Sequence, residues 1–133
     1  MSAAVRILLV DDHQLFSHGL ATLLNLDERL EVVGRAQNGR EALERVDELR
    51  PDVVLMDLEM PVVDGVEATR AIVADYPETK VLVLTGDDGM EGVSAALRAG
   101  ASGVVRKTQD AMELIDVLIA TASLGVSRRA SSQ

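Results

Sequence analysis

The chain has 133 residues, a length that suits one domain able to bury roughly 65–70% of its unfolded surface. It contains no cysteine, which excludes a disulfide framework and a zinc–thiolate site. Its formal net charge is −9, from 13 basic and 22 acidic side chains, so these residues alone are not expected to bind DNA. Phe16 and Tyr76 are the only aromatic residues, which excludes a surface for stacking bases.

The amino-terminal apolar stretch is too short for a signal peptide, and it runs directly into Asp11 and Asp12. No stretch of the sequence approaches the length of a membrane span. We therefore expect a cytoplasmic protein that does not contact the membrane.

Apolar runs alternate with segments of helical periodicity along the chain. The predicted strands cover residues 5–10, 30–36, 53–56, 80–84 and 102–106. The predicted helices run from 13 to about 24, from 40 to 50, from just after 65 to about 76, from about 93 to 99 and from 109 to 124. Leu15, Leu20, Leu23 and Leu24 recur at helical spacing in the first helix, Asn38-Gly39 is expected to turn the chain, and Thr108 resembles a helix N-cap.

This alternation predicts an α/β fold with a five-stranded parallel sheet and helices on both faces. Right-handed crossovers leave few possible topologies for such a sheet. Residues 1–124 are expected to form the domain. Residues 125–133 are small, polar and basic, and are expected to be a flexible tail or the start of a linker to an output domain.

Polar side chains follow several of the predicted strands where each one ends. Asp57 ends the central apolar run, Asp11 and Asp12 follow the first strand, Thr85 follows the fourth and Lys107 the fifth. Carboxyl ends of parallel strands share one edge of the sheet, where ligands bind in open α/β folds. Three crowded carboxylates need a cation, and an all-oxygen site with few protein ligands suits Mg²⁺. An Asp carboxylate can accept a phosphoryl group, and a hydroxyl and an ammonium can bind its oxygens.

Each of these residues also has a simpler interpretation. An Asp after a strand is commonly a cap or turn residue, but capping does not explain all of these residues at strand ends. His13 and His18 are interpreted as surface or cap residues in preference to metal ligands, because they begin a helix and no cysteine is near. Gly86 and Gly89 are assigned to a flexible loop, because no glycine-rich phosphate motif is present.

With these residues in place, the sequence resembles the receiver domain of bacterial two-component response regulators, from about residue 5 to 125. The resemblance is strongest to the NarL/FixJ (LuxR-type) subgroup, and it is carried by the phrases VDDHQLF, VLMDLEMPVVDGVEATR, VLVLTGDD and LRAGASGVVRK. It implies a flavodoxin-like (βα)5 fold with strand order 2-1-3-4-5.

The resemblance also implies roles for individual residues. Asp57 would be the phosphoacceptor, loaded from a phosphohistidine on a sensor histidine kinase. The Asp12 and Asp57 side chains and the backbone carbonyl of Glu59 would hold Mg²⁺, with Asp11 acting through a bound water. Thr85 would be the switch that moves to the phosphoryl group, and Lys107 would form an ion pair with that group. Glu59 and Asp87 would tune the rate of phosphoryl loss. Pro61 and Gly65 would shape the loop over the site.

One position departs from the family pattern. The family usually has Tyr or Phe three residues before the lysine, where this chain has Val104. Valine has no ring to rotate and a stiff χ1, so we expect weaker coupling from Thr85 to the surface than in receivers with the aromatic residue. The subgroup further implies transcriptional regulation, with DNA bound only through an output domain that lies outside this chain, and a possible homodimer through receiver helices.

Three other functions remain to be weighed. The chain could be a receiver-like interaction module that acts without phosphorylation, an interpretation that Val104 mildly favours. A haloacid-dehalogenase-type aspartyl phosphatase also uses an Asp at a strand end, but it leaves Asp11 and Asp12 unexplained. A flavodoxin is excluded, because its phosphate loop after the first strand would not be two acids.

Overall fold

The computed structural model describes residues 3–58, 60, 65–86, 90–107 and 109–131, and the side chains of these apart from 90, 91 and 125–131. The strands are β1 (Val5–Val10), β2 (Leu30–Ala36), β3 (Val53–Asp57), β4 (Lys80–Thr85) and β5 (Gly103–Arg106). The helices are α1 (Gln14–Asn25), α2 (Gly39–Leu49), α3 (Gly65–Asp75), α4 (Met90–Ala99) and α5 (Ala111–Ser131).

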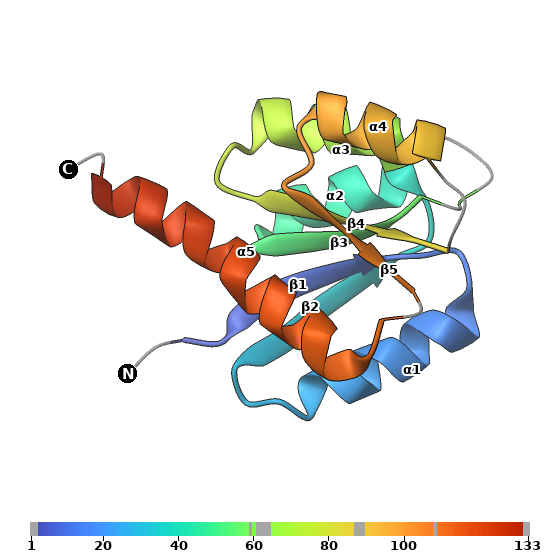
Figure 1. The fold of residues 1–133 in the computed structure, drawn as a ribbon, viewed down its shortest axis with the longest axis vertical. Helices are drawn as coiled ribbons and strands as arrows, with labels where there is room; N and C mark the ends of the chain where they lie inside the picture. The colour runs from blue at the N-terminus through green and yellow to red at the C-terminus, as the bar shows by residue number, and fades with distance from the viewer. Residues whose placement is uncertain (1–2, 59, 61–64, 87–89, 108, 132–133) are drawn as a thin grey trace.

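The strands form one parallel sheet in the order β2-β1-β3-β4-β5, as expected. Helices α1 and α5 cover one face of this sheet, and α2, α3 and α4 cover the other (Figure 1). All the strands point the same way, so their carboxyl ends meet at a single edge. No helix in the described part of the chain is long and apolar enough to cross a membrane.

The central strands are buried on both faces and contribute alternate side chains to two cores. Leu8, Val54 and Val81 pack with α2, α3 and α4 residues such as Val46 and Ile72. The other core is formed by the side chains at the intervening strand positions, which pack against residues of α1 and α5. Every residue of β3 is buried, so Asp57 ends a strand that is fixed on both sides.

The boundaries of α2 follow from local chemistry. The Asn38 side chain accepts a 2.9 Å hydrogen bond from the Glu41 backbone N–H, which makes Asn38 the N-cap and Gly39 the first helical residue. The expected turn at Asn38-Gly39 is therefore a helix start. The helix ends at Leu49, and its C-cap residue Arg50 is left-handed (φ 49°) and is followed by Pro51.

The leucine pattern of α1 predicted the helix but not which side chains are buried. Leu24 is fully buried, whereas Leu23 is 41% exposed and Leu15 is 87% exposed. The apolar stripe is wider than the part of the helix that the sheet covers, because α1 packs beside β1 and β2 near the edge of the fold. Spacing alone does not locate the edge of a buried face.

Helix α5 is longer than predicted. Its backbone is helical through Ser131, so the expected helix end before Gly125 is wrong. A single glycine inside a helix costs only about 1 kcal/mol relative to alanine, so Gly125 does not have to end it. Whether residues 125–133 lead into a further domain stays a prediction.

Candidate functional site

Three carboxylates lie together at the carboxyl edge of the sheet. Val10 of β1 pairs with Met56 of β3, so the next residue on each strand, Asp11 and Asp57, lies beside the other. Asp12 joins them, and one ligand atom from each of these acids and from His13 lies within 4.8 Å of the others. The Asp57 side chain is fully buried, Asp11 is 5% exposed and Asp12 is 28% exposed.

The backbone around these acids is fixed by the sheet. The Asp11 N–H donates to the Ala36 carbonyl (2.9 Å), and the Leu58 N–H donates to the Leu84 carbonyl (3.0 Å). Gly65 opens α3 directly against the site, where an added Cβ would come within 3.0 Å of the Asp57 carbonyl oxygen. A larger residue at that position would push on the backbone of Asp57.

Lys107 faces Asp57 from the end of β5. Its Nζ lies 3.2 Å from Asp57 Oδ2, and its side chain is 18% exposed. The Lys107 N–H donates to the Thr85 carbonyl (2.7 Å), which joins the ends of β4 and β5. Thr85 is buried at 5% exposure. The structure thus brings Asp11, Asp12, Asp57, Thr85 and Lys107 to one edge, as their positions at strand ends predicted.

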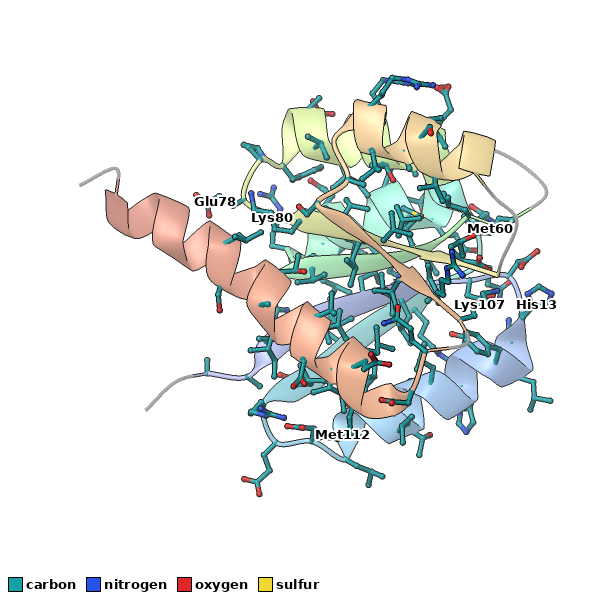
Figure 2. The ribbon with its side chains drawn as sticks, viewed as in Figure 1. His13, Met60, Glu78, Lys80, Lys107 and Met112 are labelled. Atoms are coloured by element: carbon teal, nitrogen blue, oxygen red, sulfur yellow. The ribbon has the colours of Figure 1, made fainter. Side chains whose placement is uncertain are left out.

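The side chains of His13 and Phe16, which sequence reasoning did not assign to the site, also lie there. His13 Nδ1 is 3.3 Å from Asp11 Oδ1 and 3.1 Å from Asp12 Oδ1. Lys107 Nζ lies 5.1 Å from the centre of the Phe16 ring, within the range of a cation–π contact. Figure 2 labels His13 and Lys107 at the same end of the sheet. The only signal in the sequence was that His13 directly follows the acid pair.

Several polar atoms in the site are buried without a hydrogen-bond partner in the described part of the protein. They are Asp11 Oδ2, Asp12 Oδ1 and Ser17 Oγ. The 3.1 Å approach of His13 Nδ1 to Asp12 Oδ1 counts as an ion-pair distance but not as a hydrogen bond, because its geometry is poor. Asp11 and Ser17 also line a cavity of about 10 Å³, close to the volume that one water needs.

This donor set can bind a hard divalent cation. One ammonium faces three carboxylates, so the edge keeps an excess of negative charge that a divalent ion would balance. Mg²⁺ prefers oxygen ligands and usually takes one or two carboxylates together with waters. The unpartnered oxygens of Asp11 and Asp12 fit that requirement.

Some predicted positions remain to be placed. Val104 lies half-buried in β5, paired with Val83 of β4, one strand away from Thr85. Glu59, Pro61 and Asp87, together with Gly89 and Thr108, lie outside the described residues.

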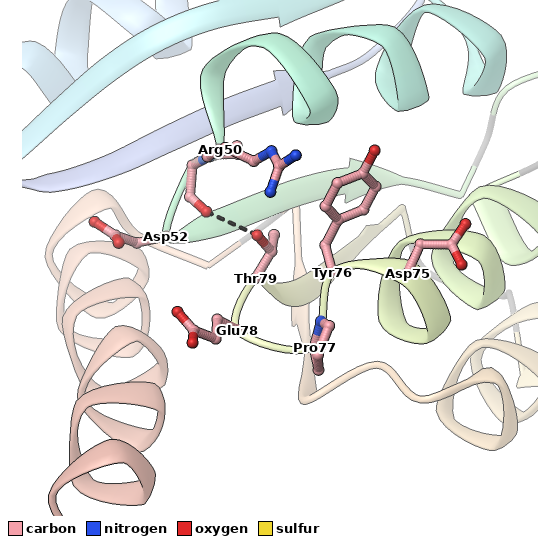
Figure 3. A pocket seen from close by; sticks show the side chains of 8 residues that line it. Arg50, Asp52, Asp75, Tyr76, Pro77, Glu78 and Thr79 are labelled. Carbon is pink, nitrogen blue, oxygen red and sulfur yellow. Dashed lines mark hydrogen bonds between the residues drawn. The ribbon is translucent and has the colours of Figure 1, made fainter.

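A second cavity lies at the opposite edge of the sheet. It has a volume of about 460 Å³ and is lined by residues 50–52 and 75–79 (Figure 3). The Thr79 hydroxyl donates to the Pro51 carbonyl (3.0 Å), and the Arg50 guanidinium lies 4.8 Å from the Tyr76 ring centre. The Tyr76 hydroxyl donates to Asp47 (2.8 Å), which raises the pKa of Tyr76. This cavity is remote from the carboxylates.

Known proteins resemble this chain in both sequence and structure. The family model for the response regulator receiver domain matches residues 7–119. The transcriptional regulatory protein DegU of Brevibacillus brevis is 43% identical over 121 residues, covering 91% of this chain and 51% of DegU. The response regulator protein VraR of Staphylococcus aureus is 40% identical over 114 residues, covering 86% of this chain and 54% of VraR. The chain therefore spans about half the length of these relatives.

Solved structures agree with the sequence relatives. The receiver domain of the response regulator NarL from Mycobacterium tuberculosis superimposes with a TM-score of 0.86 at 34% identity, covering 92% of this chain and 98% of that domain. A LuxR-family two-component response regulator from Aurantimonas gives a TM-score of 0.84 at 36% identity, covering 90% of this chain and 86% of that one. Together with the family match over residues 7–119, this establishes that the chain belongs to the response regulator receiver domain family, in its NarL/FixJ (LuxR-type) subgroup.

Proposed function

We propose that this receiver accepts one phosphoryl group on Asp57 from a phosphohistidine of a sensor histidine kinase, in a reaction that requires Mg²⁺. The observation that carries the proposal is the fully buried Asp57 carboxylate, set beside two other acids and 3.2 Å from the Lys107 ammonium. A carboxylate at the end of a fixed strand, with the Lys107 ammonium beside it and two further acids that could hold a divalent ion, is arranged for nucleophilic attack on phosphorus.

The reaction forms one bond and breaks one. An Asp57 oxygen bonds to phosphorus, the phosphorus–nitrogen bond of the phosphohistidine breaks, and the departing imidazole takes a proton from solvent. Lys107 pairs with the phosphoryl oxygens as it now pairs with Asp57, and the Thr85 hydroxyl moves to donate to one of them. Because little covalent work falls to the protein, its contribution is positioning and charge neutralisation.

The residues that would hold the ion are the Asp12 and Asp57 side chains and the Glu59 backbone carbonyl, with Asp11 acting through a bound water. When bound, Mg²⁺ would neutralise the charge that carboxylates and phosphoryl oxygens bring together. Loss of the phosphoryl group by hydrolysis would use the same site. Glu59 and Asp87, which lie outside the described residues, remain predicted to tune its rate.

The output is proposed from the subgroup and its relatives. Both DegU and VraR are named as regulators, and DegU as a transcriptional one. We propose that phosphorylation changes transcription through an output domain that binds DNA, and that receiver helices form a homodimer. A cytoplasmic location stays the prediction made from the sequence.

A receiver that acts without phosphorylation is the second candidate, and Val104 is the observation in its favour. A haloacid-dehalogenase-type phosphatase is not proposed, because the chain belongs to the receiver family. The two remaining candidates differ in one property. Only a phosphorylated receiver gains mass on exposure to a phosphodonor.

Intact-mass spectrometry tests the proposal. Wild type and Asp57→Asn are incubated with a cognate kinase or a small acyl phosphate, with Mg²⁺ or with a chelator. Wild type should gain one phosphoryl group in Mg²⁺ and almost none with the chelator, and Asp57→Asn should gain none. Asp116→Asn, which removes an exposed acid on α5, is the matched control and should behave as wild type. Equal labelling of wild type and Asp57→Asn would remove Asp57 from this role.

A further inference from the structure

We propose that His13 supplies a ring nitrogen to the metal site, so that the site binds first-row transition ions such as Mn²⁺, Co²⁺, Ni²⁺ and Zn²⁺ in addition to Mg²⁺. The inference deepens the proposed function, since it uses the same carboxylates. It concerns which ions the site takes, and therefore can fail while the phosphorylation chemistry stands.

The first observation is the position of the His13 ring. Nδ1 lies 3.1 Å from Asp12 Oδ1 and 3.3 Å from Asp11 Oδ1, and Asp57 supplies an oxygen to the same cluster within 4.8 Å. Adjacent ligands on an octahedral or tetrahedral ion with bonds of about 2.0–2.2 Å stand roughly 3.0–3.5 Å apart. The nitrogen and the two oxygens are therefore spaced as ligands of one ion.

The second observation is that each of the two acids beside this ring has one buried oxygen without a hydrogen bond among the described residues, Oδ2 in Asp11 and Oδ1 in Asp12. Asp11 is 95% buried, yet its Oδ2 has no partner in the described part of the protein, and the same holds for Asp12 Oδ1. A buried carboxylate oxygen without a donor is costly, and binding an ion removes that cost. These oxygens indicate a ligand independently of the clustering of acids.

Helix capping does not account for the ring. His13 is the N-cap residue of α1, but its side chain makes no cap hydrogen bond. Its backbone N–H donates to Asp11 Oδ1 (2.7 Å), and ring Nδ1 lies at a long hydrogen-bond distance, 3.3 Å, from the same oxygen. The ring is 62% exposed and could extend into water. It lies instead against two carboxylates.

The ligand chemistry sets the preference among ions. Carboxylate and water suit Mg²⁺, whereas an imidazole nitrogen favours the later first-row ions, whose affinity rises from Mn²⁺ to Cu²⁺. With its proton on Nε2, the ring presents a lone pair at Nδ1 to the cluster. A site with three carboxylates and one imidazole therefore binds Ni²⁺ or Zn²⁺ more tightly than a site of oxygens alone, while Mg²⁺ gains little.

Calorimetric titration of the whole chain with Ni²⁺ and with Mg²⁺ measures this preference. His13→Gln should lower the ratio of Ni²⁺ to Mg²⁺ affinity by about 10–100-fold. Removing a residue that only hydrogen-bonds a metal ligand typically costs that much, so removing a direct ligand should cost at least as much. His18→Gln is the matched control, since His18 is exposed on the same helix and the chain has no other histidine. It should leave the ratio unchanged. An equal loss of both affinities in His13→Gln would overturn the proposal.

Pulsed EPR of bound Mn²⁺ gives a second readout that does not depend on a variant folding. Wild type labelled with ¹⁵N-histidine should show a nitrogen coupling to the ion, and His13→Gln should lose it. Absence of the coupling in wild type would overturn the proposal. Phosphorylation of wild type in Mg²⁺, measured separately, reports on the proposed function and distinguishes failure of one from failure of the other.

Discussion

Crowding of the acids makes a prediction about stability without metal. Asp12→Asn removes one charge from the cluster and keeps the size of the side chain. In the described part of the protein the Lys107 ammonium pairs with Asp57, whereas Asp12 lies 3.1 Å from the His13 ring. Neutralising Asp12 should therefore raise the free energy of unfolding of the metal-free protein.

The size of the effect follows from the distances. Charges no more than 4.8 Å apart repel by at least about 3.5 kcal/mol at an effective dielectric constant of 20, and Asp12 faces both Asp11 and Asp57. Asp12 is 28% exposed, so solvent screens much of this repulsion. We expect a gain of about 1–2 kcal/mol, above the range of exposed pairs. Asp57→Asn should gain less, since it also loses the pairing with Lys107.

Urea unfolding in a chelator, followed by circular dichroism, measures the gain. With a slope of about 2 kcal/mol per molar urea, the middle of the usual range, the midpoint of Asp12→Asn should rise by roughly 0.5–1 M. Saturating Mg²⁺ should narrow the difference, because the ion binds only the folded state and the wild type binds it more tightly. Asp116→Asn makes the same charge change on exposed α5 and should barely move the midpoint. A lower midpoint for Asp12→Asn would mean that its carboxylate is a structural cap.

Three further predictions concern other parts of the fold. Phosphorylation should change amide hydrogen exchange across residues 92–118 only modestly in wild type. Val104→Tyr should enlarge that change, because it restores a ring that can follow Thr85 inward. A large change in wild type that Val104→Tyr does not enlarge would indicate another signalling route. The hydrogen bond from Tyr76 to Asp47 raises the pKa of Tyr76 above its ordinary value, and Asp47→Ala should lower that pKa. Tyr76 is the sole tyrosine, so ultraviolet absorbance follows its ionisation. The stabilisation from this bond should be present below the ordinary pKa of tyrosine and lost as pH rises through the raised pKa. Gly100 has φ +115°, and an added Cβ would lie 2.8 Å from a Val73 methyl, so Gly100→Ala should cost about 1–3 kcal/mol in a thermal or urea melt, and an unchanged midpoint would contradict this.

The residues at the strand ends were predictable because two physical signals coincide there. Short runs of branched apolar residues mark buried strands, and Asp57 or Lys107 interrupts such a run at a definite point. Parallel pairing then brings those points to one edge with no further information needed. Periodicity predicted a five-stranded parallel sheet, whereas the strand order was implied by the family resemblance, and both are confirmed.

Features set by side-chain direction were not predictable in the same way. The ring of His13 could have extended into water, and only the fold shows it beside Asp11 and Asp12. Leu15 matches the helical period of its neighbours but is 87% exposed, because periodicity gives a direction around the helix and not the extent of the sheet beneath it. The length of α5 was missed because Gly125 weakens a helix without ending it.

Chemical reduction tests directly whether Asp57 itself carries the phosphoryl group. An aspartyl phosphate is reduced by borohydride to homoserine, so phosphorylating the chain in Mg²⁺, reducing it and mapping its peptides by mass spectrometry locates the modified residue. We predict homoserine at position 57 alone, with none in the chelator control. Homoserine at another acid, or a phosphoryl group that resists reduction and lies elsewhere in the chain, would contradict it.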